Sequence, residues 1–188
     1  MVEIFPYKSS WPSDFRAIAA QLRQGLGELA LRIDHIGSTS VPGLAAKDII
    51  DIQITVKALD QGVLSAMTAL GYTRPERIWR DHCPPGFEDR ETQWEKWLFW
   101  EPPDQRPTNT HVRILGRANQ RYPLLFRDYL RTHLATANAY AELKRRLAAN
   151  LADPRTYPEV KDPAVDLIYW AAEEWASANH WQPGPSDA

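Results

Sequence analysis

The chain has a single cysteine, Cys83, among 188 residues. One cysteine cannot form an intrachain disulfide, and it excludes a zinc site built from several cysteines. The sequence also lacks an apolar run of membrane-spanning length, and its first ten residues, MVEIFPYKSS, contain no hydrophobic signal-peptide core. These absences predict a soluble, cytoplasmic protein that has no membrane partner.

A strong charge of either sign is missing as well. Lysine and arginine total 22, aspartate and glutamate total 24, and the formal net charge is −2 at pH 7. This balance gives no electrostatic attraction for bulk nucleic acid, and without a basic stripe it disfavours nucleic-acid partners and RNA modification. Hydrophobic residues make up 44% of the chain, which is enough for a globular core.

The apolar periodicity predicts the elements of one small domain. Helices are expected at 12–29, 60–70, 121–133, 136–150 and 158–178, and strands at 31–36, 48–56, 95–101 and 110–115. The polar segment 81–93 is predicted to be a mobile loop. We therefore predict an α+β fold, in which a small mixed β-sheet is backed by helices and a C-terminal helical layer begins near residue 117. The domain covers 1–178, and a frayed tail follows at 179–188.

The segment at 35–55, HIGSTSVPGLAAKDIIDIQIT, carries the strongest functional signal. A predicted strand runs into a turn formed by Gly37, Ser38, Thr39 and Ser40. Glycine lets the backbone approach a ligand closely, and the hydroxyls with nearby backbone N–H groups can hold phosphate oxygens. An ordinary polar turn is the competing interpretation, but the position upstream of an aspartate-bearing strand favours phosphate binding.

The strand after this turn alternates, so that Asp51 and Gln53 share its polar face. Aspartate is disfavoured inside strands, and we predict that Asp51 is a catalytic residue that ligates a single Mg²⁺ beside the phosphates. Gln53 is expected to position water or substrate. Lys47, just before the strand, fits a solvated lysine and a polyphosphate-neutralising cation equally well.

The strand at 110–115 carries His111 and Arg113 on one face. Such a pair suits an anion better than a metal. The unperturbed pKa of histidine lies near neutrality, so His111 is a candidate general base. One histidine and one arginine on a solvated sheet face is the alternative, and we favour the anion-facing role.

Two further pairs lie four residues apart, so each pair shares a helix face. Arg127 and Arg131 can clamp a phosphate or carboxylate bidentately. Tyr140 and Lys144 can contact a substrate. A solvated or packed helix face explains each pair equally well.

These motifs resemble the GrpB family, also called UPF0157, of the nucleotidyltransferase superfamily. The resemblance rests on the segment at 35–55, on FRDYLR at 126–131, and on Tyr140, Lys144, Tyr157 and Lys161. It runs from Tyr7 to about Trp175 and implies a nucleotidyltransferase-like fold. The superfamily pattern is Gly-Ser followed by a strand with Asp-hydrophobic-Asp/Glu, and the chain matches it except at Gln53.

The resemblance implies a protein that binds a nucleotide or another phosphorylated small molecule. The associated reaction is transfer of a nucleotidyl or phosphoryl group to a small acceptor. Two-metal transfer usually needs several carboxylates, and Gln53 replaces one of them. The alternative is therefore a non-catalytic ligand-sensing or partner-binding module that retains the fold. In some proteins a GrpB-like domain is fused to dephospho-CoA kinase, which associates the family with coenzyme A metabolism.

Overall fold

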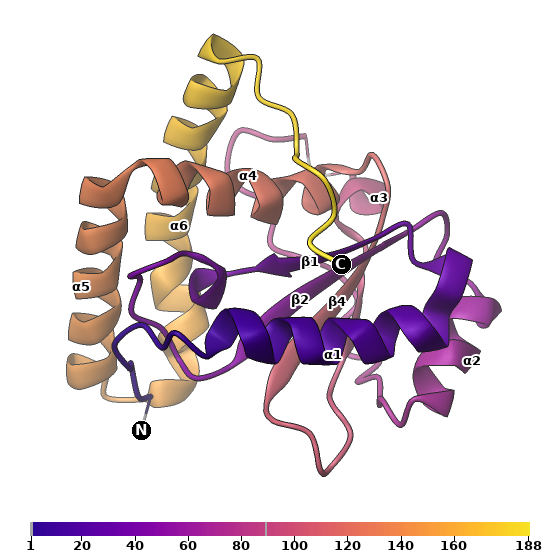
Figure 1. Cartoon of the computed structure of the whole chain (residues 1–188). Helices are drawn as coiled ribbons and strands as arrows, with labels where there is room; N and C mark the ends of the chain where they lie inside the picture. Colours follow the sequence, from indigo (N-terminus) through magenta and orange to yellow (C-terminus); the bar gives the residue numbers. More distant parts are fainter. Residues whose placement is uncertain (1, 89) are drawn as a thin grey trace.

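The structure, a computed structural model, describes residues 2–88 and 90–188 (Figure 1). Its elements in chain order are α1 (Trp11–Leu26), η1 (Gly27–Leu29), β1 (Arg32–Ile36), η2 (Ser38–Ser40), β2 (Ile50–Val56), α2 (Gln61–Ala69), α3 (Glu91–Trp94), β3 (Trp97–Phe99), β4 (Thr108–Ile114), α4 (Ala118–Thr132), α5 (Leu134–Asn150), η3 (Pro154–Thr156) and α6 (Tyr157–Ala178). The predicted helices and strands are all present, and the short α3 inside the predicted loop is an addition. Within the described ranges, no helix is long and apolar enough to cross a membrane.

Four strands form one mixed sheet in the order β1-β2-β4-β3. Strand β2 lies antiparallel to β1 and parallel to β4, and β3 is antiparallel to β4. The parallel register sets Asp51 opposite Asn109 and Gln53 opposite His111. The predicted α+β fold with a small mixed sheet is therefore confirmed, and β2 and β4 bring the predicted polar residues to neighbouring positions.

The alternation of β2 decides which face of the sheet is buried under α1 and α2. Ile50, Ile52 and Ile54 are each 0% exposed and pack with the buried faces of these two helices. Burying a side chain of this size contributes about 1.5–3 kcal/mol relative to leaving it exposed. The polar residues of β2 consequently point to the opposite face.

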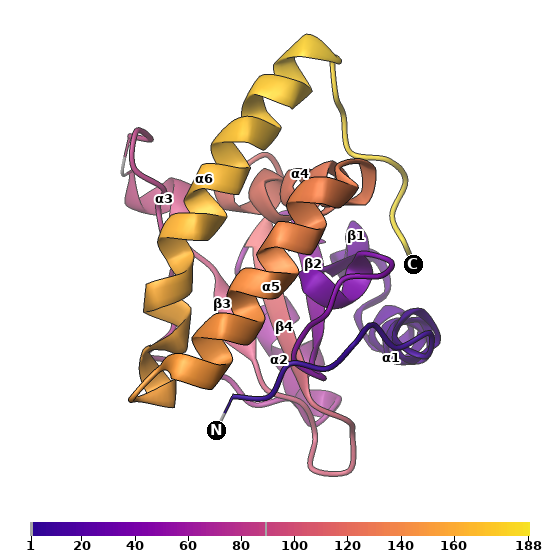
Figure 2. The same ribbon diagram turned by 90° about the vertical axis from the view of Figure 1, so that its left-hand side faces the viewer.

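The three C-terminal helices lie on the opposite side of the sheet from α1 (Figure 2). A second buried cluster joins α4, α5 and α6 to the segment that follows η2, and this segment contributes Val41, Leu44 and Ala45. Because that segment packs into the helical layer, the layer also fixes the position of the Gly-Ser turn just before it.

The C-terminal tail is ordered on the edge strand β1, which contradicts the expectation that it frays (Figure 1). Ala188 N donates to Ile33 O at 3.1 Å. Ile33 N donates to Ser186 Oγ at 2.9 Å, and His35 N donates to Asp187 Oδ2 at 2.9 Å. An edge strand presents unpaired backbone groups, and the tail supplies partners for them. Local composition gives no sign of this pairing, because the two segments lie far apart in sequence.

Candidate functional site

A cavity of about 590 Å³ lies between the polar face of the sheet and the helical layer. Ligand pockets commonly have volumes of about 300–1,000 Å³. The charged residues of its lining are Lys47, Asp51, Asp81, Lys96, Lys144, Lys161 and Asp162. Four lysines and three aspartates give the lining a small formal excess of positive charge, which favours an anionic ligand over a cationic one.

Seven of the residues predicted from the sequence meet in this cavity. They are Ser38, Thr39, Lys47, Asp51, His111, Tyr140 and Lys144. Tyr157 and Lys161 line it too, because α6 begins at Tyr157 and so carries both on its first turns. Residues from five separate stretches of the chain therefore converge on one site, which local structure alone would not bring about.

Asp51 is the carboxylate that β2 directs toward the cavity. Asn109 Nδ2 donates to its Oδ1 at 2.8 Å, as the parallel register requires. Burial raises the pKa of Asp51, while the hydrogen bond from Asn109 and the positive charges of Lys161, Lys144 and Lys47 oppose this rise. The carboxylate is thus held by one neutral donor and surrounded by cations.

Lys144 joins the helical layer to the Gly-Ser turn. Its Nζ donates to Ser38 Oγ at 2.8 Å and to Ala45 O at 2.5 Å. Burial lowers the pKa of Lys144 to about 7; Lys161 acts in the same direction and Asp51 opposes it. An amine that is only partly charged near pH 7 would gain charge when an anion enters, because an opposite charge favours the protonated form.

Two other lysines, Lys96 and Lys47, line the cavity. Lys96 Nζ lies 2.5 Å from Asp81 Oδ1, and burial lowers the pKa of Lys96 against the opposing effect of Asp81. Lys47 Nζ lies 4.3 Å from the centre of the Tyr157 ring, and burial lowers its pKa as well. Lys96 is therefore paired with a carboxylate, whereas Lys47 rests on an aromatic face.

His111 lines the cavity in its neutral form. Burial, with the charges of Lys96 and Arg113, places the pKa of His111 well below its ordinary value. Within the described chain, its buried Nδ1 has no hydrogen-bond partner. A histidine with so low a pKa is a weak base, so this site favours hydrogen bonding by His111. Its predicted role as a general base stays a prediction.

Gln53 and Arg113 lie outside the cavity, contrary to expectation. Gln53 is 0% exposed; its Nε2 donates to Gln120 O at 2.9 Å, and its Oε1 accepts from Arg113 Nη1 at 2.7 Å. Arg113 also binds Asp81, with Nε 2.8 Å from Oδ2. The start of α4 covers this part of the polar face, so these side chains already have hydrogen-bond partners within the protein.

Arg127, Arg131 and Ser40 are also placed elsewhere. Arg127 Nη1 donates to His35 O at 3.1 Å, and Arg131 donates to Ser40 O from Nε at 3.1 Å and from Nη2 at 2.9 Å. Ser40 Oγ donates to Gly37 O at 2.6 Å. The two arginines thus hold the backbone around the turn from outside the cavity, and the predicted phosphate clamp is wrong.

Sequence reasoning missed several residues of this site, among them Asp81, Lys96 and Asn109. Asp81, at the start of the segment predicted to be a mobile loop, is anchored by Lys96, Arg113 and Asn119. Lys96 lies between two tryptophans, Trp94 and Trp97, and directly follows Glu95, so the local sequence favours a surface ion pair and gives no clear signal of a cavity position. Asn109 shares the face of His111 two residues earlier, so extending the alternation by one step would have found it.

The carboxylates fit at most one metal ion. Among the residues described, no group of three or more His, Cys, Asp or Glu side chains could hold a metal. Mg²⁺ is commonly held by one or two protein carboxylates together with substrate phosphates. Asp51 could hold one Mg²⁺ that shares its remaining ligands with phosphate oxygens, whereas a metal pair does not fit.

Comparison with solved structures places the fold. The crystal structure of the conserved protein GrpB from Enterococcus faecalis matches with a TM-score of 0.70 and 29% identity, covering 92% of this chain and 99% of that one. Cid1 in complex with its short product ApU matches with a TM-score of 0.51 and 13% identity, covering 77% of this chain and 43% of that one. The second likeness concerns the fold alone, which is nucleotidyltransferase-like.

Comparison of sequences gives the family. Dephospho-CoA kinase of Mycobacterium bovis is 36% identical over 198 residues, covering 96% of this chain and 48% of the relative, so the chain spans about half the length of that curated protein. A UPF0157 protein of Deinococcus radiodurans is 33% identical, covering 91% of this chain and 82% of the relative. The family model described as GrpB protein matches residues 1–170. The chain belongs to the GrpB family.

Proposed function

We propose that this protein binds a nucleotide or another phosphorylated small molecule in the lysine-lined cavity. The observation that carries the proposal is that Lys47, Lys144 and Lys161 line one cavity with Ser38, whose hydroxyl accepts from Lys144. Each of these groups is a donor that suits phosphate oxygens, and charge-assisted hydrogen bonds are about twice as strong as neutral ones. Tyr140 and Tyr157 also line the cavity, and their rings support Lys144 and Lys47, whose Nζ atoms lie 4.6 Å and 4.3 Å from the ring centres.

Asp51 would hold a single Mg²⁺ that enters with the phosphates. The ion would supply charge neutralisation at the phosphate oxygens when bound. The chain itself would orient the phosphates through Ser38 and the lysines, and would shield them from water by the walls from α5 and α6. Transfer of a nucleotidyl or phosphoryl group to a small acceptor is the reaction that this arrangement would serve.

Binding without group transfer is the second candidate. Gln53, where the superfamily pattern has a second carboxylate, is buried and bonded to Arg113. The neighbouring strand presents Asn109 rather than an acid opposite Asp51. One carboxylate offers less compensation for a transferring phosphoryl group than the several that two-metal enzymes use. These observations support a module that senses or holds its ligand.

A thermal-shift panel tests the binding proposal. The panel includes the four nucleoside triphosphates and, because of the names of the curated relatives, dephospho-CoA and coenzyme A, each with and without Mg²⁺. A ligand at about 100 times its Kd adds about 2.7 kcal/mol to the free energy of unfolding. We expect at least one phosphorylated compound to raise the Tm, and an unchanged Tm across the panel would refute the proposal. Release of labelled product from the bound nucleotide then separates transfer from binding alone.

A further inference from the structure

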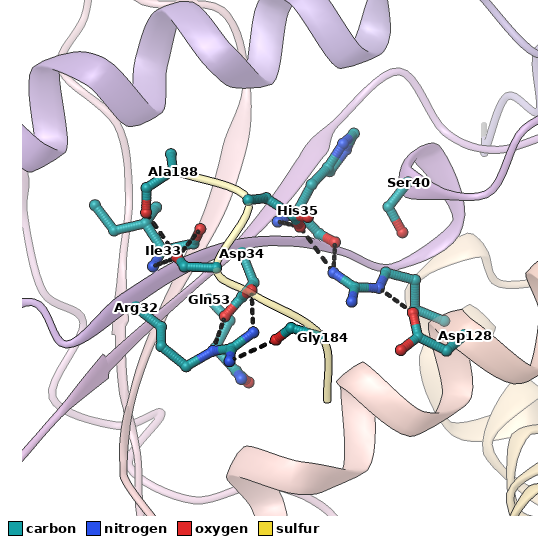
Figure 3. Close-up of polar contacts among 12 residues, drawn as sticks. Arg32, Ile33, Asp34, His35, Ser40, Gln53, Asp128, Gly184 and Ala188 are labelled. Atoms are coloured by element: carbon teal, nitrogen blue, oxygen red, sulfur yellow. Dashed lines mark hydrogen bonds and ion pairs between the residues drawn. The ribbon is translucent and has the colours of Figure 1, made fainter. Parts of the chain in front are cut away.

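The C-terminal tail reaches the neighbourhood of the Gly-Ser turn through a buried arginine. Figure 3 shows the tail passing beside β1, with polar contacts that run from it to His35 and toward Asp128. Asp187 Oδ2 accepts from Arg127 Nη1 at 2.8 Å and from His35 N at 2.9 Å. The side chain of Arg127 is 3% exposed, and a buried charge requires paired, hydrogen-bonded partners. Asp187 and Asp128 are those partners.

The side chain of His35 connects β1 to the Gly-Ser turn. Its Nε2 lies 3.0 Å from Thr39 Oγ1, and its ring stacks on Phe15 with centroids 4.7 Å apart. Burial, together with the charges of Arg131 and Arg127, lowers the pKa of His35 to about 3. The ring is therefore neutral near pH 7 and can share one hydrogen with the hydroxyl of Thr39, a residue that lines the cavity.

The turn is thus bonded from both sides. On the inner side, Lys144 donates to Ser38 Oγ at 2.8 Å. On the outer side, Arg131 donates to Ser40 O, one helical turn along α4 from Arg127. Asp187 itself does not line the cavity as the described residues define it, so any effect of Asp187 on a ligand has to pass through these contacts.

We infer that Asp187 is a positioning residue for the phosphate-binding turn. Its carboxylate fixes Arg127 and the His35 backbone, and His35 in turn holds Thr39 in place beside the cavity. The ligand part of this inference rests on the proposed function, whereas the positioning of the turn is a property of the folded chain alone. The tail therefore helps to position the turn, although it pairs with the edge of β1 that faces away from β2.

Hydrogen exchange of the turn amides tests the positioning directly. Ser40 N and Val41 N donate within the turn, to Gly37 O at 3.3 Å and to Ser38 O at 3.2 Å. In Asp187→Ala we expect both amides to exchange faster than in the wild type. We also expect weaker binding of ATP with Mg²⁺ by roughly two- to thirtyfold, since residues that do not touch the ligand typically alter coupling by about 0.5–2 kcal/mol.

Ser186→Ala is the matched control in the same tail. It removes the Oγ that accepts from Ile33 N at 2.9 Å, and it leaves the Asp187 carboxylate in place. We expect faster exchange at Ile33 with unchanged exchange at the turn and unchanged ATP affinity. Asp187→Asn, which keeps an acceptor for His35 N and loses the charge beside Arg127, should fall between wild type and Asp187→Ala and serves if the alanine variant does not fold.

The outcomes separate this inference from the proposed function. If Ser40 and Val41 exchange at wild-type rates in the Asp187 variants, the inference is overturned, whatever the ATP affinity of these variants. Faster exchange with unchanged ATP affinity would overturn the ligand part of the inference, because the position of the turn would then not affect ligand binding. If the wild type binds no ATP while exchange at the turn rises, the nucleotide proposal fails and the positioning of the turn by Asp187 is supported.

Discussion

Gly37 lies so close to Asp51 that a β-carbon at position 37 would stand 2.8 Å from Cγ of the Asp51 carboxyl group. Gly37 also has a φ of +66°, a left-handed conformation that glycine adopts without steric cost. The Asp51 carboxyl group therefore occupies the space that a side chain at position 37 would need. This relationship explains why a glycine precedes Ser38, independently of any contact between the Gly37 backbone and a phosphate.

We expect Gly37→Ala to damage both the fold and the site. The new methyl group meets Asp51 and the positive φ adds strain, which together should lower the free energy of unfolding by about 1–3 kcal/mol. Urea denaturation measures the loss, and titration with ATP measures binding. Gly43→Ala is the control, since Gly43 has a φ of +80° and nothing within 4 Å of a β-carbon. Equal losses in both variants would show that backbone strain alone matters at Gly37.

The lowered pKa of Lys144 predicts that ligand affinity depends on pH. Its pKa in the folded protein is about 7, below the ordinary 10.5. A polyanion favours the charged amine, so binding takes up a proton above pH 7 and weakens as the pH rises, with a slope approaching tenfold per pH unit for one proton. Calorimetric titrations between pH 7.5 and pH 9 measure this slope, in a range where phosphates are already fully ionised. A flat profile in the wild type would contradict the prediction.

Lys144→Met is the variant that assigns this pH effect. It should bind the ligand more weakly and with little pH dependence over the same range. In the absence of ligand the sign is opposite, because the unfolded chain holds the Lys144 proton more tightly than the folded chain. The free energy of unfolding of the wild type should therefore rise with pH between 7 and 10.5, relative to Lys144→Met. A parallel pH profile for the two proteins would place the titration elsewhere.

Asn109→Asp should create a stronger metal site. The amide of Asn109 donates to Asp51 Oδ1 at 2.8 Å, so an aspartate there would put two carboxylates side by side. Their repulsion should destabilise the metal-free protein, and Mg²⁺ or Mn²⁺ should restore the stability, because hard cations prefer charged oxygen ligands. Metal titration by calorimetry would reveal tighter binding, and unchanged metal affinity would mean that position 109 does not share the Asp51 site.

Gln53→Glu is the contrasting substitution. The superfamily pattern suggests that a carboxylate at position 53 would strengthen metal binding, but in the structure it would face Arg113 and leave Gln120 O without its donor. We expect no gain in metal affinity and a loss of stability of about 1–3 kcal/mol from the unsatisfied carbonyl. Tighter binding of Mn²⁺ by this variant would show that position 53 faces the metal after all.

The fold could be predicted from the sequence wherever the pattern is local. The Ile50, Ile52 and Ile54 alternation fixed which face of β2 is buried, and it correctly directed Asp51 to the polar face. The same rule could not show that α4 covers only the Gln53 end of that face, because helix placement depends on packing between distant segments. The alternation therefore predicts one polar site along β2, while the structure divides this face into a cavity and a buried hydrogen-bond network.

Charged residues on helices were the hardest to interpret. Arg131 and Lys144 both looked like candidate ligand-binding cations, yet Arg131 binds a backbone carbonyl outside the cavity and Lys144 lies inside it. Spacing places such residues on a face of a helix, but only the docking of that helix decides what the face meets. The position of the tail cannot be predicted from local sequence either, since the pairing of Asp187 with Arg127 joins segments 60 residues apart.

Titration of ATP with Mg²⁺ into the wild type, Lys161→Gln and Lys57→Gln tests the central claim most directly. Lys161 lines the cavity, whereas Lys57 is exposed at the end of β2 and lies outside it. Losing one charge-assisted contact to phosphate costs about 1.5–3 kcal/mol, or roughly 10- to 100-fold in Kd. The account predicts that loss for Lys161→Gln and an unchanged Kd for Lys57→Gln. Equal affinity in all three proteins would contradict the assignment of the lysine-lined cavity as the phosphate site.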